Sequence, residues 1–294
     1  MKLLVTGATG FLGSRTADLL EERGHELVRV ARPRGAERAA AARADLVHVD
    51  VGDPAARELL QGCHAVLHFA GVPDPARARL DPARAIRENA GATLNLLEGC
   101  LEHGAGLVYP STVRAALDPP PDAYAISKRL GEEVCHLHTA RSAVARLTSV
   151  FGPGQVAWEG ATGAISSFAA RALAGDVLTI PGDPYRGRDF VFVDDLVPAF
   201  ERIASGGFWG QTVTLARGET TPLLEAAQLV VAAAGTGAPI ETPTAELPPG
   251  ENVTYSADPP PPNLGFTCRP LEEGIGLYVD WLTRHPAPQG RSGA

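Results

Sequence analysis

The feature that most constrains the fold is a glycine-rich turn near the N-terminus. The apolar, β-type run at residues 2–6 is followed at once by the spacing Gly-x-x-Gly-x-x-Gly, and an amphipathic helical pattern then covers residues 12–23. Glycines at this spacing let a chain turn tightly between strand and helix, so that backbone amides can approach a pyrophosphate at the helix N-terminus. The turn therefore predicts a dinucleotide-binding unit. The residues expected to line the phosphates are Gly7, Gly10, Phe11, Leu12 and Gly13.

Strand-like and helix-like patterns alternate through the first half of the chain. Strands are predicted at residues 2–6, 26–31, 46–49, 65–69, 106–109 and 143–147, and helices at 12–23, 54–60, 83–103 and 124–140. Strands that alternate with helices pair in parallel through right-handed crossovers. The pattern predicts the α/β class, with a doubly wound parallel (Rossmann) sheet.

The composition of the sequence changes after about residue 152, where glycine and proline become frequent. Helices are predicted there at 164–174 and 223–234, and the prolines at 259–262 predict a stiff connector because proline lacks the amide donor. We expect residues 1–152 to form the NADP-binding domain. Residues 153–283 are expected to form mainly a small substrate-binding domain, with some segments returning to the sheet. Residues 284–294, rich in Pro, Gly and Ser, are expected to be a disordered tail.

Composition excludes several functional classes. The 294 residues carry a net charge of −8, which argues against a nucleic-acid partner because phosphate backbones require a basic face. No run of 18 apolar residues suggests a membrane span, and the N-terminus does not resemble a signal peptide, so a cytoplasmic location is expected. The four cysteines lie far apart without a CxxC pair, so we expect free thiols, neither disulfides nor a metal site.

The end of the second strand bears on the choice of cofactor. In Rossmann folds an acidic residue at this point holds the ribose of NAD, whereas an arginine accommodates the 2′-phosphate of NADP. Here the strand ends in Ala31 and is followed by Arg32-Pro33-Arg34. Guanidinium groups match phosphate geometry, so Arg32 and Arg34 favour NADP(H), with NAD(H) possible. A solvated arginine pair in a loop is the alternative.

Further cofactor contacts are expected where later strands end, because strand carboxyl ends line the cofactor crevice of an open sheet. Asn89 is added to them as a polar residue inside a predicted helix, where either a buried hydrogen bond or plain tolerance would explain it. Asp53, which precedes a proline, is expected instead to cap a helix. The additional candidates are Asp50, Val51, Phe69, Ala70, Gly71 and Asn89.

The most specific chemical signal is Tyr124-Ala-Ile-Ser-Lys128. A spacing of four residues places the phenol and the ammonium on one helical face. A nearby ammonium stabilises a phenolate, so the pKa of the tyrosine is expected to fall and the phenol can exchange a proton with a substrate. Ser111 and Thr112, at the end of the preceding strand, supply hydroxyls that could orient a carbonyl group.

In combination these motifs resemble the extended short-chain dehydrogenase/reductase family, which includes nucleotide-sugar epimerases, dehydratases and ketoreductases. The resemblance covers residues 2–282 and extends to two later motifs, one running from Arg146 to Phe151-Gly152-Pro153 and one from Arg188 to Asp195. It implies that Thr112 polarises the substrate carbonyl or carbinol and that Tyr124 is the acid/base. It also implies that Lys128 binds the nicotinamide ribose and that Arg188 holds a substrate phosphate, for which a structural ion pair is the alternative.

The sequence departs from the family pattern on the substrate side. Ser149 stands where an asparagine is expected and remains a candidate substrate contact, together with Ser111. Only eleven residues separate Thr112 from Tyr124, and the segment between them is rich in proline. The redox residues are thus intact while those that recognise a sugar are altered.

These observations lead to one expected function and three alternatives. The expected function is NADPH-dependent reduction of a keto group, on a nucleotide-linked deoxysugar. The alternatives are a nucleotide-sugar 4-epimerase, a dehydratase, and a non-catalytic NADP-binding regulator, against which the intact Thr112, Tyr124 and Lys128 argue. The helices predicted at 83–103 and 124–140 are expected to pair with a second copy in a homodimer.

Overall fold

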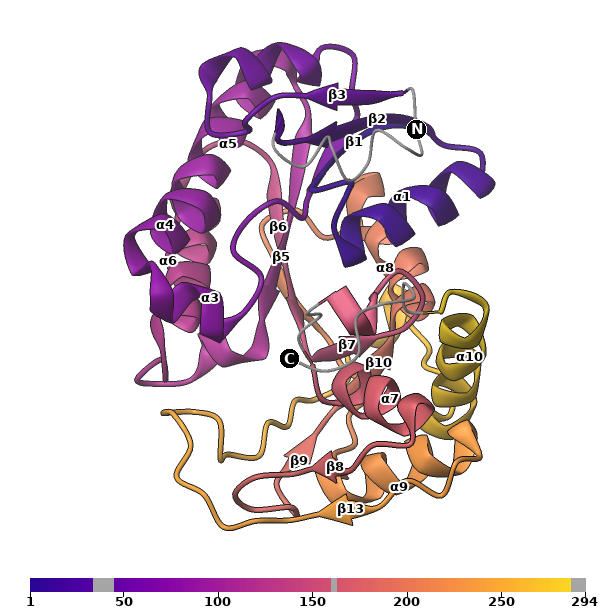
Figure 1. The fold of residues 1–294 in the computed structure, drawn as a ribbon. Helices are drawn as coiled ribbons and strands as arrows, with labels where there is room; N and C mark the ends of the chain where they lie inside the picture. Colours follow the sequence, from indigo (N-terminus) through magenta and orange to yellow (C-terminus); the bar gives the residue numbers. More distant parts are fainter. Residues whose placement is uncertain (34–44, 160–162, 287–294) are drawn as a thin grey trace.

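The computed structural model describes residues 1–33, 45–159 and 163–286. Figure 1 shows a parallel sheet with helices on both faces, and a smaller helical part beside the carboxyl ends of several strands. All four cysteines are free thiols; Cys63, Cys100 and Cys135 are buried and Cys268 is half-buried. Within the described residues, no helix has the length and apolar character needed to span a membrane.

Seven strands form the central sheet, in the order β11-β6-β5-β4-β1-β2-β3, and every neighbouring pair is parallel. The chain moves outward from β1 to β3 and then returns to the other side of β1 with β4. This reversal creates the switch point at which open α/β sheets bind ligands. The predicted doubly wound parallel sheet is therefore confirmed. The strands are β1 Lys2–Thr6, β2 Glu26–Ala31, β3 Leu46–His48, β4 Ala65–His68, β5 Gly106–Thr112, β6 Ser142–Leu147 and β11 Thr212–Leu215.

The two faces of the sheet bury different sets of apolar residues, because side chains alternate along each strand. Leu3 and Val5 of β1 join the core formed with α1 and α8, while Leu4 faces the core formed with α5 and α6. Figure 1 shows these helix pairs on opposite sides of the sheet. The helices of this part are α1 Phe11–Glu22, α3 Pro75–Leu80, α4 Pro82–Ile86, α5 Ala92–His103, α6 Ala123–Leu137 and α8 Val197–Arg202.

The helix predicted at 83–103 is confirmed in its extent, since the chain is helical from Pro82 to His103, but it contains a π-helical turn that was not predicted. The chain forms α4, then one π-helical turn at Arg87–Gly91, and then α5. The buried amide of Asn89 lies in this turn and bonds to Val72 and Ser127 outside the helix. Single π-turns of this kind are frequent at functional sites. By contrast, the predicted cap is confirmed, because Asp53 accepts the amide of Ala55 at 2.9 Å and begins the 3₁₀ helix Pro54–Leu60.

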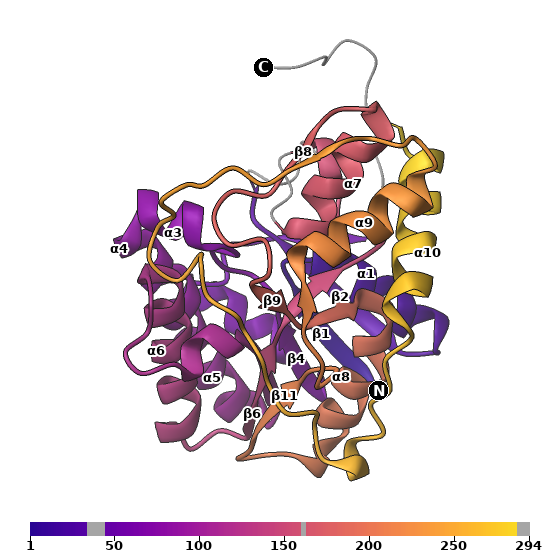
Figure 2. The same ribbon diagram turned by 90° about the horizontal axis from the view of Figure 1, so that it is seen from below.

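The smaller part is built around α7, α9 and α10, whose apolar sides form a separate core. Helices were predicted at α7 and α9, whereas α10 was not predicted. The chain that follows β13 runs back toward α3 and α6, as Figure 2 shows from below. The elements are α7 Ala164–Ala174, α9 Leu223–Ala234 and α10 Leu271–Arg284, with the short strands β7 Ser149–Phe151, β8 Leu178–Thr179, β9 Gly187–Arg188, β10 Phe190–Phe192, β12 Thr221–Pro222 and β13 Ile240–Glu241.

Candidate active site

The glycine turn between β1 and α1 has the close packing that its sequence predicts. Gly7 has a φ of +65°, and a Cβ atom at Gly13 would lie 2.3 Å from the carbonyl oxygen of Gly7. Helix α1 begins with Phe11 and Leu12, and its N-cap residue, Gly10, has no side chain with which to cap the first turn. The first amides of a helix bind anions when no side chain satisfies them. The turn therefore fits the pyrophosphate of a dinucleotide.

The loop after β4 lies directly beside this turn. The amide of Ala70 donates to Thr6 Oγ1 at 3.0 Å, and a Cβ atom at Gly7 would lie 2.8 Å from the nitrogen of Ala70. Phe69 packs edge-on against a phenylalanine of α8, at 5.2 Å between ring centroids. The two loops thus meet at the switch point, and this brings the predicted residues Phe69, Ala70 and Gly71 next to the phosphate site.

Asn89 supports this loop. Its Oδ1 accepts the amide of Val72 at 2.8 Å, and its Nδ2 donates to the carbonyl of Val72 at 3.1 Å and to Ser127 Oγ at 2.9 Å. A Cβ atom at Gly71 would lie 2.2 Å from Asn89 Oδ1. Asn89 therefore links the loop after β4 to helix α6. A direct contact of Asn89 with the cofactor stays a prediction.

The candidates for the adenosine end of the cofactor lie at the edge of the sheet. Arg32 is 42% exposed, and its Nη1 lies 2.5 Å from Oε1 of Glu88. The exposed carboxylate of Asp50 accepts the amide two residues later at 2.9 Å, and Val51 is buried. Arg34 lies outside the described residues. The only contact described for the Arg32 guanidinium is thus a carboxylate that a bound phosphate would have to displace or share.

Thr112 and Tyr124 meet where β5 ends and α6 begins. The Thr112 hydroxyl is close enough to the phenol of Tyr124 to favour its ionised form, and Thr112 is buried while Tyr124 is half-buried. Asp122 caps α6 by accepting the amide of Ala125 at 2.9 Å, which fixes the first turn on which Tyr124 lies. The pKa of Tyr124 is raised, because burial disfavours the phenolate more strongly than the positive charge of Arg114 favours it. The expected fall in the pKa of Tyr124 is therefore wrong for this structure.

Lys128 is directed toward the end of β5. Its Nζ donates to the carbonyl of Pro110 at 2.8 Å and lies 4.7 Å from the centre of the Tyr109 ring. Burial lowers the pKa of this ammonium to about 8. The neighbouring Ser111 is buried, and its Oγ has no hydrogen-bond partner among the residues that the structure describes. An available hydroxyl and a poorly solvated ammonium at one strand end suit the binding of sugar hydroxyls.

A small cavity of about 80 Å³ opens beside Thr112. It brings together Thr112, Ser149 and Arg188 as the sequence predicts. Its lining is completed by five residues that were not predicted. These are Val113, Arg114, Thr148, Asp189 and Tyr255.

The guanidinium of Arg188 is held by backbone groups. It donates to the carbonyls of Gly187, at 2.9 Å, of Glu251, at 3.1 Å, and of Val253. Burial lowers its pKa to about 10. In the part of the chain that the structure describes it pairs with no carboxylate, and an uncompensated buried charge is costly. The alternative of a structural ion pair therefore has no support here.

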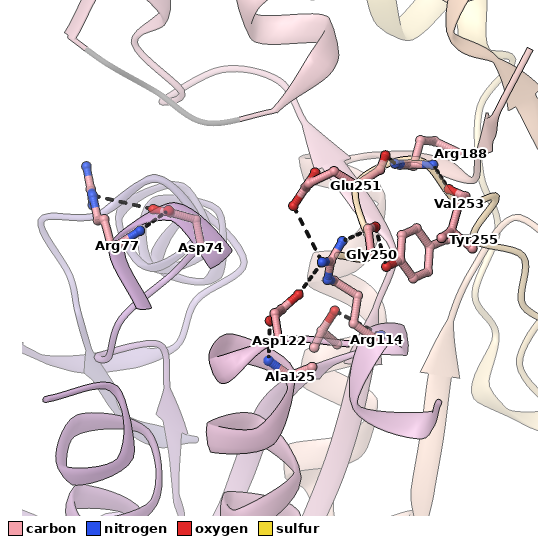
Figure 3. A network of polar contacts seen from close by, with 11 residues as sticks. Asp74, Arg77, Arg114, Asp122, Ala125, Arg188, Gly250, Glu251, Val253 and Tyr255 are labelled. Atoms are coloured by element: carbon pink, nitrogen blue, oxygen red, sulfur yellow. Dashed lines mark hydrogen bonds and ion pairs between the residues drawn. The ribbon is translucent and has the colours of Figure 1, made fainter. Parts of the chain in front are cut away.

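Figure 3 shows a polar network on the substrate side that sequence reasoning missed. Arg114 pairs with Asp122 and reaches Oε1 of Glu251 at 3.5 Å, while Arg114 and Arg188 each stack on the ring of Tyr255 at 4.8 Å. One signal in the sequence could have indicated Arg114, because a cation two residues after a catalytic hydroxyl lies close to the reacting group. The partners at 251 and 255 are too distant in sequence to be inferred.

Comparison with known proteins agrees with this arrangement. The NAD-dependent epimerase/dehydratase family model matches residues 3–211. The chain is 28% identical to a dTDP-4-dehydro-6-deoxy-D-allose reductase of Streptomyces bikiniensis, covering 96% of each protein. It superimposes on the UDP-glucose 4-epimerase of Thermotoga maritima, solved with UDP-glucose, with a TM-score of 0.82 and 25% identity, over 97% of this chain and 99% of the other.

A further solved structure has a similar likeness. MoeE5, in complex with UDP-glucose and NAD, gives a TM-score of 0.84 at 25% identity, covering 97% of this chain and 99% of that one. The family match covers well over half of the chain, and residues 3–211 include the glycine turn, the ends of β4 and β5 and the helix that carries Tyr124. The resemblance inferred from the sequence is thereby confirmed. The chain belongs to the NAD-dependent epimerase/dehydratase family of enzymes.

Proposed function

We propose that this protein is an NADPH-dependent ketoreductase acting on the keto group of a nucleotide-linked deoxysugar. The observation that carries the proposal is the placement of Tyr124 on the first turn of α6, next to Thr112 at the cavity and one helical turn before Lys128, whose ammonium is directed to the end of β5. The similarity to a deoxysugar nucleotide reductase over 96% of both chains supports the same substrate class.

The bound nicotinamide supplies the hydride, and the protein handles the proton. Thr112 and Tyr124 donate hydrogen bonds to the carbonyl oxygen, which makes the carbonyl carbon more electrophilic. As the carbon is reduced, the O–H bond of Tyr124 breaks and its proton moves to the developing alkoxide. The raised pKa of Tyr124 keeps the phenol protonated at neutral pH, as a proton donor requires. Lys128 is placed to bind the nicotinamide ribose.

The cavity favours reduction or epimerisation over dehydration. Eliminating water next to a keto group requires a base that removes the proton from the adjacent carbon. Among the described residues that line the cavity, the only carboxylate is Asp189. This group already accepts the amides of Arg217 at 3.0 Å and Gly218 at 2.8 Å, and the hydroxyl of Thr148 at 3.2 Å. The epimerase remains the second candidate because it uses the same proton donor.

Stoichiometry distinguishes the reductase from the epimerase. The test supplies a dTDP-linked 4-keto-6-deoxyhexose and NADPH, and compares product formation with the fall in absorbance at the nicotinamide band. We expect one NADPH to be oxidised for each alcohol formed. Interconversion of two sugar nucleotides at constant absorbance would instead establish an epimerase. Failure to turn over any ketone, with NADPH still bound, would favour the regulator.

Arg32 is proposed to select NADP(H) by binding the 2′-phosphate. Two observations support this role: position 31 is alanine and not an acidic residue, and the Arg32 guanidinium is exposed beside Glu88. In Arg32→Ala the affinity for NADPH should fall by about 10- to 100-fold, with little change for NADH, because a charge-assisted contact to the phosphate is lost. Fluorescence titration with both cofactors measures this. A wild-type protein that prefers NADH would contradict this role and leave Arg32 with the ion pair in which it donates to Glu88.

Arg188 is proposed to bind a phosphate of the substrate. Its guanidinium lines the cavity, donates to carbonyl groups and stacks on Tyr255, and it pairs with no carboxylate among the described residues, so an anion can approach it. Calorimetry with dTDP should show at least about tenfold weaker binding to Arg188→Ala, since a hydrogen-bonded ion pair is worth roughly 1.5–3 kcal/mol. Arg171→Ala, on the outer side of α7, is the matched control. Equal affinities for dTDP in all three proteins would assign Arg188 to stabilising the backbone of residues 251–253.

A homodimer is proposed through helices α5 and α6. These helices expose large apolar side chains that a monomer would leave in water. Light scattering in solution gives the subunit count directly. The exposed apolar residues on the two helices are Leu94, Leu101, Ile126, Leu130 and Leu137.

The cytoplasmic location also stays a prediction.

A further inference from the structure

Arg114 connects three parts of the molecule that are far apart in sequence. Its backbone amide donates to Thr112 Oγ1 at 3.3 Å, and its guanidinium pairs with Asp122, the cap of the helix that carries Tyr124. The same guanidinium reaches the segment 250–255, through Glu251 Oε1 at 3.5 Å and the ring of Tyr255 at 4.8 Å. Figure 3 shows Arg114 between these two groups of partners.

The charge of Arg114 also acts on the proton donor. Among the charged groups around Tyr124, Arg114 lowers the pKa of the phenol, while the carboxylates of Asp74, before α3, and Asp122, before α6, raise it. Lys128, on the same helix as Tyr124, donates instead to a backbone carbonyl at 2.8 Å. The position of the Arg114 guanidinium therefore affects how readily Tyr124 gives up its proton.

The segment 250–255 reaches Arg114 only because residue 250 is glycine. Gly250 has a φ of +77°, and a Cβ atom there would lie 2.7 Å from Pro121 Cβ and 2.9 Å from Arg114 Nη2. Its carbonyl accepts from Arg114 Nη1 at 3.3 Å. The cavity beneath the segment measures about 80 Å³, well below the roughly 300 Å³ at which ligand pockets begin. The segment contributes Tyr255 to the lining of this cavity, so a shift of the segment would enlarge it.

We propose that Arg114 is a positioning residue through which the placement of segment 250–255 controls the proton donor Tyr124. With the segment seated, the carbonyl of Gly250, Glu251 and Tyr255 hold the guanidinium in the position from which its charge acts on the phenol. When the segment lifts, Asp122 remains as the one fixed partner described for the side chain, and the charge is free to move away from Tyr124. Through this coupling, Tyr124 would release its proton most readily when segment 250–255 is closed over the substrate. This inference rests on the proposed reductase function only because its kinetic test measures that activity.

The kinetic test compares Arg114→Gln and Arg114→Lys with the control Arg129→Gln. Arg129 donates to the carbonyls of Ala115, at 2.8 Å, and Leu117, so it supports the same turn after Thr112. It has no described contact with segment 250–255. The control variant therefore removes a guanidinium from the same neighbourhood without touching the proposed coupling.

The measured quantity is the pH profile of kcat in the alcohol-oxidising direction, which needs the phenolate, with the dTDP-linked 6-deoxyhexose as substrate. Removing the positive charge in Arg114→Gln should move the rising limb upward by about one pH unit, since a neighbouring cation lowers a phenol pKa by roughly that amount or more. Arg114→Lys should restore most of the shift, and Arg129→Gln should not move the limb. If kcat of a folded Arg114→Gln variant rose at the same pH as kcat of the wild type, the proposal would be overturned.

A second variant separates the segment from the charge. Gly250→Ala keeps Arg114 but forces the segment away from it, so the limb should again move upward and KM should rise. Hydrogen–deuterium exchange, which needs no substrate, should show faster exchange of residues 250–255 in Arg114→Gln and Gly250→Ala but not in Arg129→Gln. If residues 250–255 exchanged faster in Gly250→Ala while kcat rose at the same pH as in the wild type, the coupling would be overturned. If the wild type reduced no ketone, the proposed function would fail, while unchanged exchange in Arg114→Gln would separately refute the anchoring role of Arg114.

Discussion

Replacement of Tyr124 with phenylalanine is expected to lower ketone reduction by about 10²- to 10⁴-fold, the usual contribution of a positioned proton donor. Phenylalanine keeps the ring that packs against Val72, Ala78 and Ala85 but removes the hydroxyl next to Thr112. Steady-state turnover with a 4-keto sugar nucleotide measures the loss. Affinity for NADPH should change little, because the glycine turn and its helix are untouched.

The control for this prediction is a second buried tyrosine. Tyr278 lies in the core of the small part and donates to the carbonyl of Gln155 at 2.6 Å. Tyr278→Phe also removes a buried hydroxyl, so it should cost stability, about 1 kcal/mol, without a comparable loss of turnover. If Tyr124→Phe retained most of the wild-type rate, the proton would have to come from another group, and the assignment of Tyr124 would be wrong.

The second large effect concerns the anchoring of helix α6 to the sheet. Arg146 of β6 makes a two-pronged ion pair with Glu132 of α6, with Nε–Oε1 at 3.0 Å and Nη2–Oε2 at 2.6 Å. Glu132 is only 2% exposed, whereas Arg146 is 26% exposed. Arg146→Met should lower the free energy of unfolding by about 3 kcal/mol, because it leaves the Glu132 carboxylate buried without a partner. Denaturant unfolding followed by circular dichroism measures the change.

A paired substitution tests the cause of this loss. When Glu132→Leu is combined with Arg146→Met, no uncompensated charge remains, and most of the stability should return. Glu132→Gln should cost less than Arg146→Met, because the remaining guanidinium can still reach water. Equal losses in Arg146→Met and in the double variant would show that packing of the arginine stem, and not the buried charge, determines the stability.

Local patterns were sufficient to predict the glycine turn, the first two strands and the helix that carries Tyr124. The predicted strands at residues 2–6 and 26–31 have the bounds of β1 and β2, and the spacing of Tyr124 and Lys128 correctly predicted a helix. These features rest on neighbours in the sequence: a period of two in strands, a period of 3.6 in helices, and glycines that permit a tight turn. The family resemblance depended on the same short motifs.

The substrate side depended on contacts between distant segments. β11 joins the sheet beside β6, and Arg188 meets the carbonyls of Glu251 and Val253 more than sixty residues later. No periodic pattern encodes such contacts. The π-turn at Asn89 escaped prediction for the same reason, since the groups that stabilise it belong to Val72 and Ser127.

The sequence by itself determined the parallel sheet and the glycine turn, and it supplied the residues proposed for proton transfer, because each follows from the chemistry of adjacent side chains. Only the tertiary structure decided the electrostatic surroundings of Tyr124. Burial raises the pKa of the phenol, and the cation that opposes this is Arg114, while Lys128 is turned to a carbonyl. Burial and the direction of a side chain are set by everything that packs around it, so the fold has to be known before the charge on a catalytic group can be assigned.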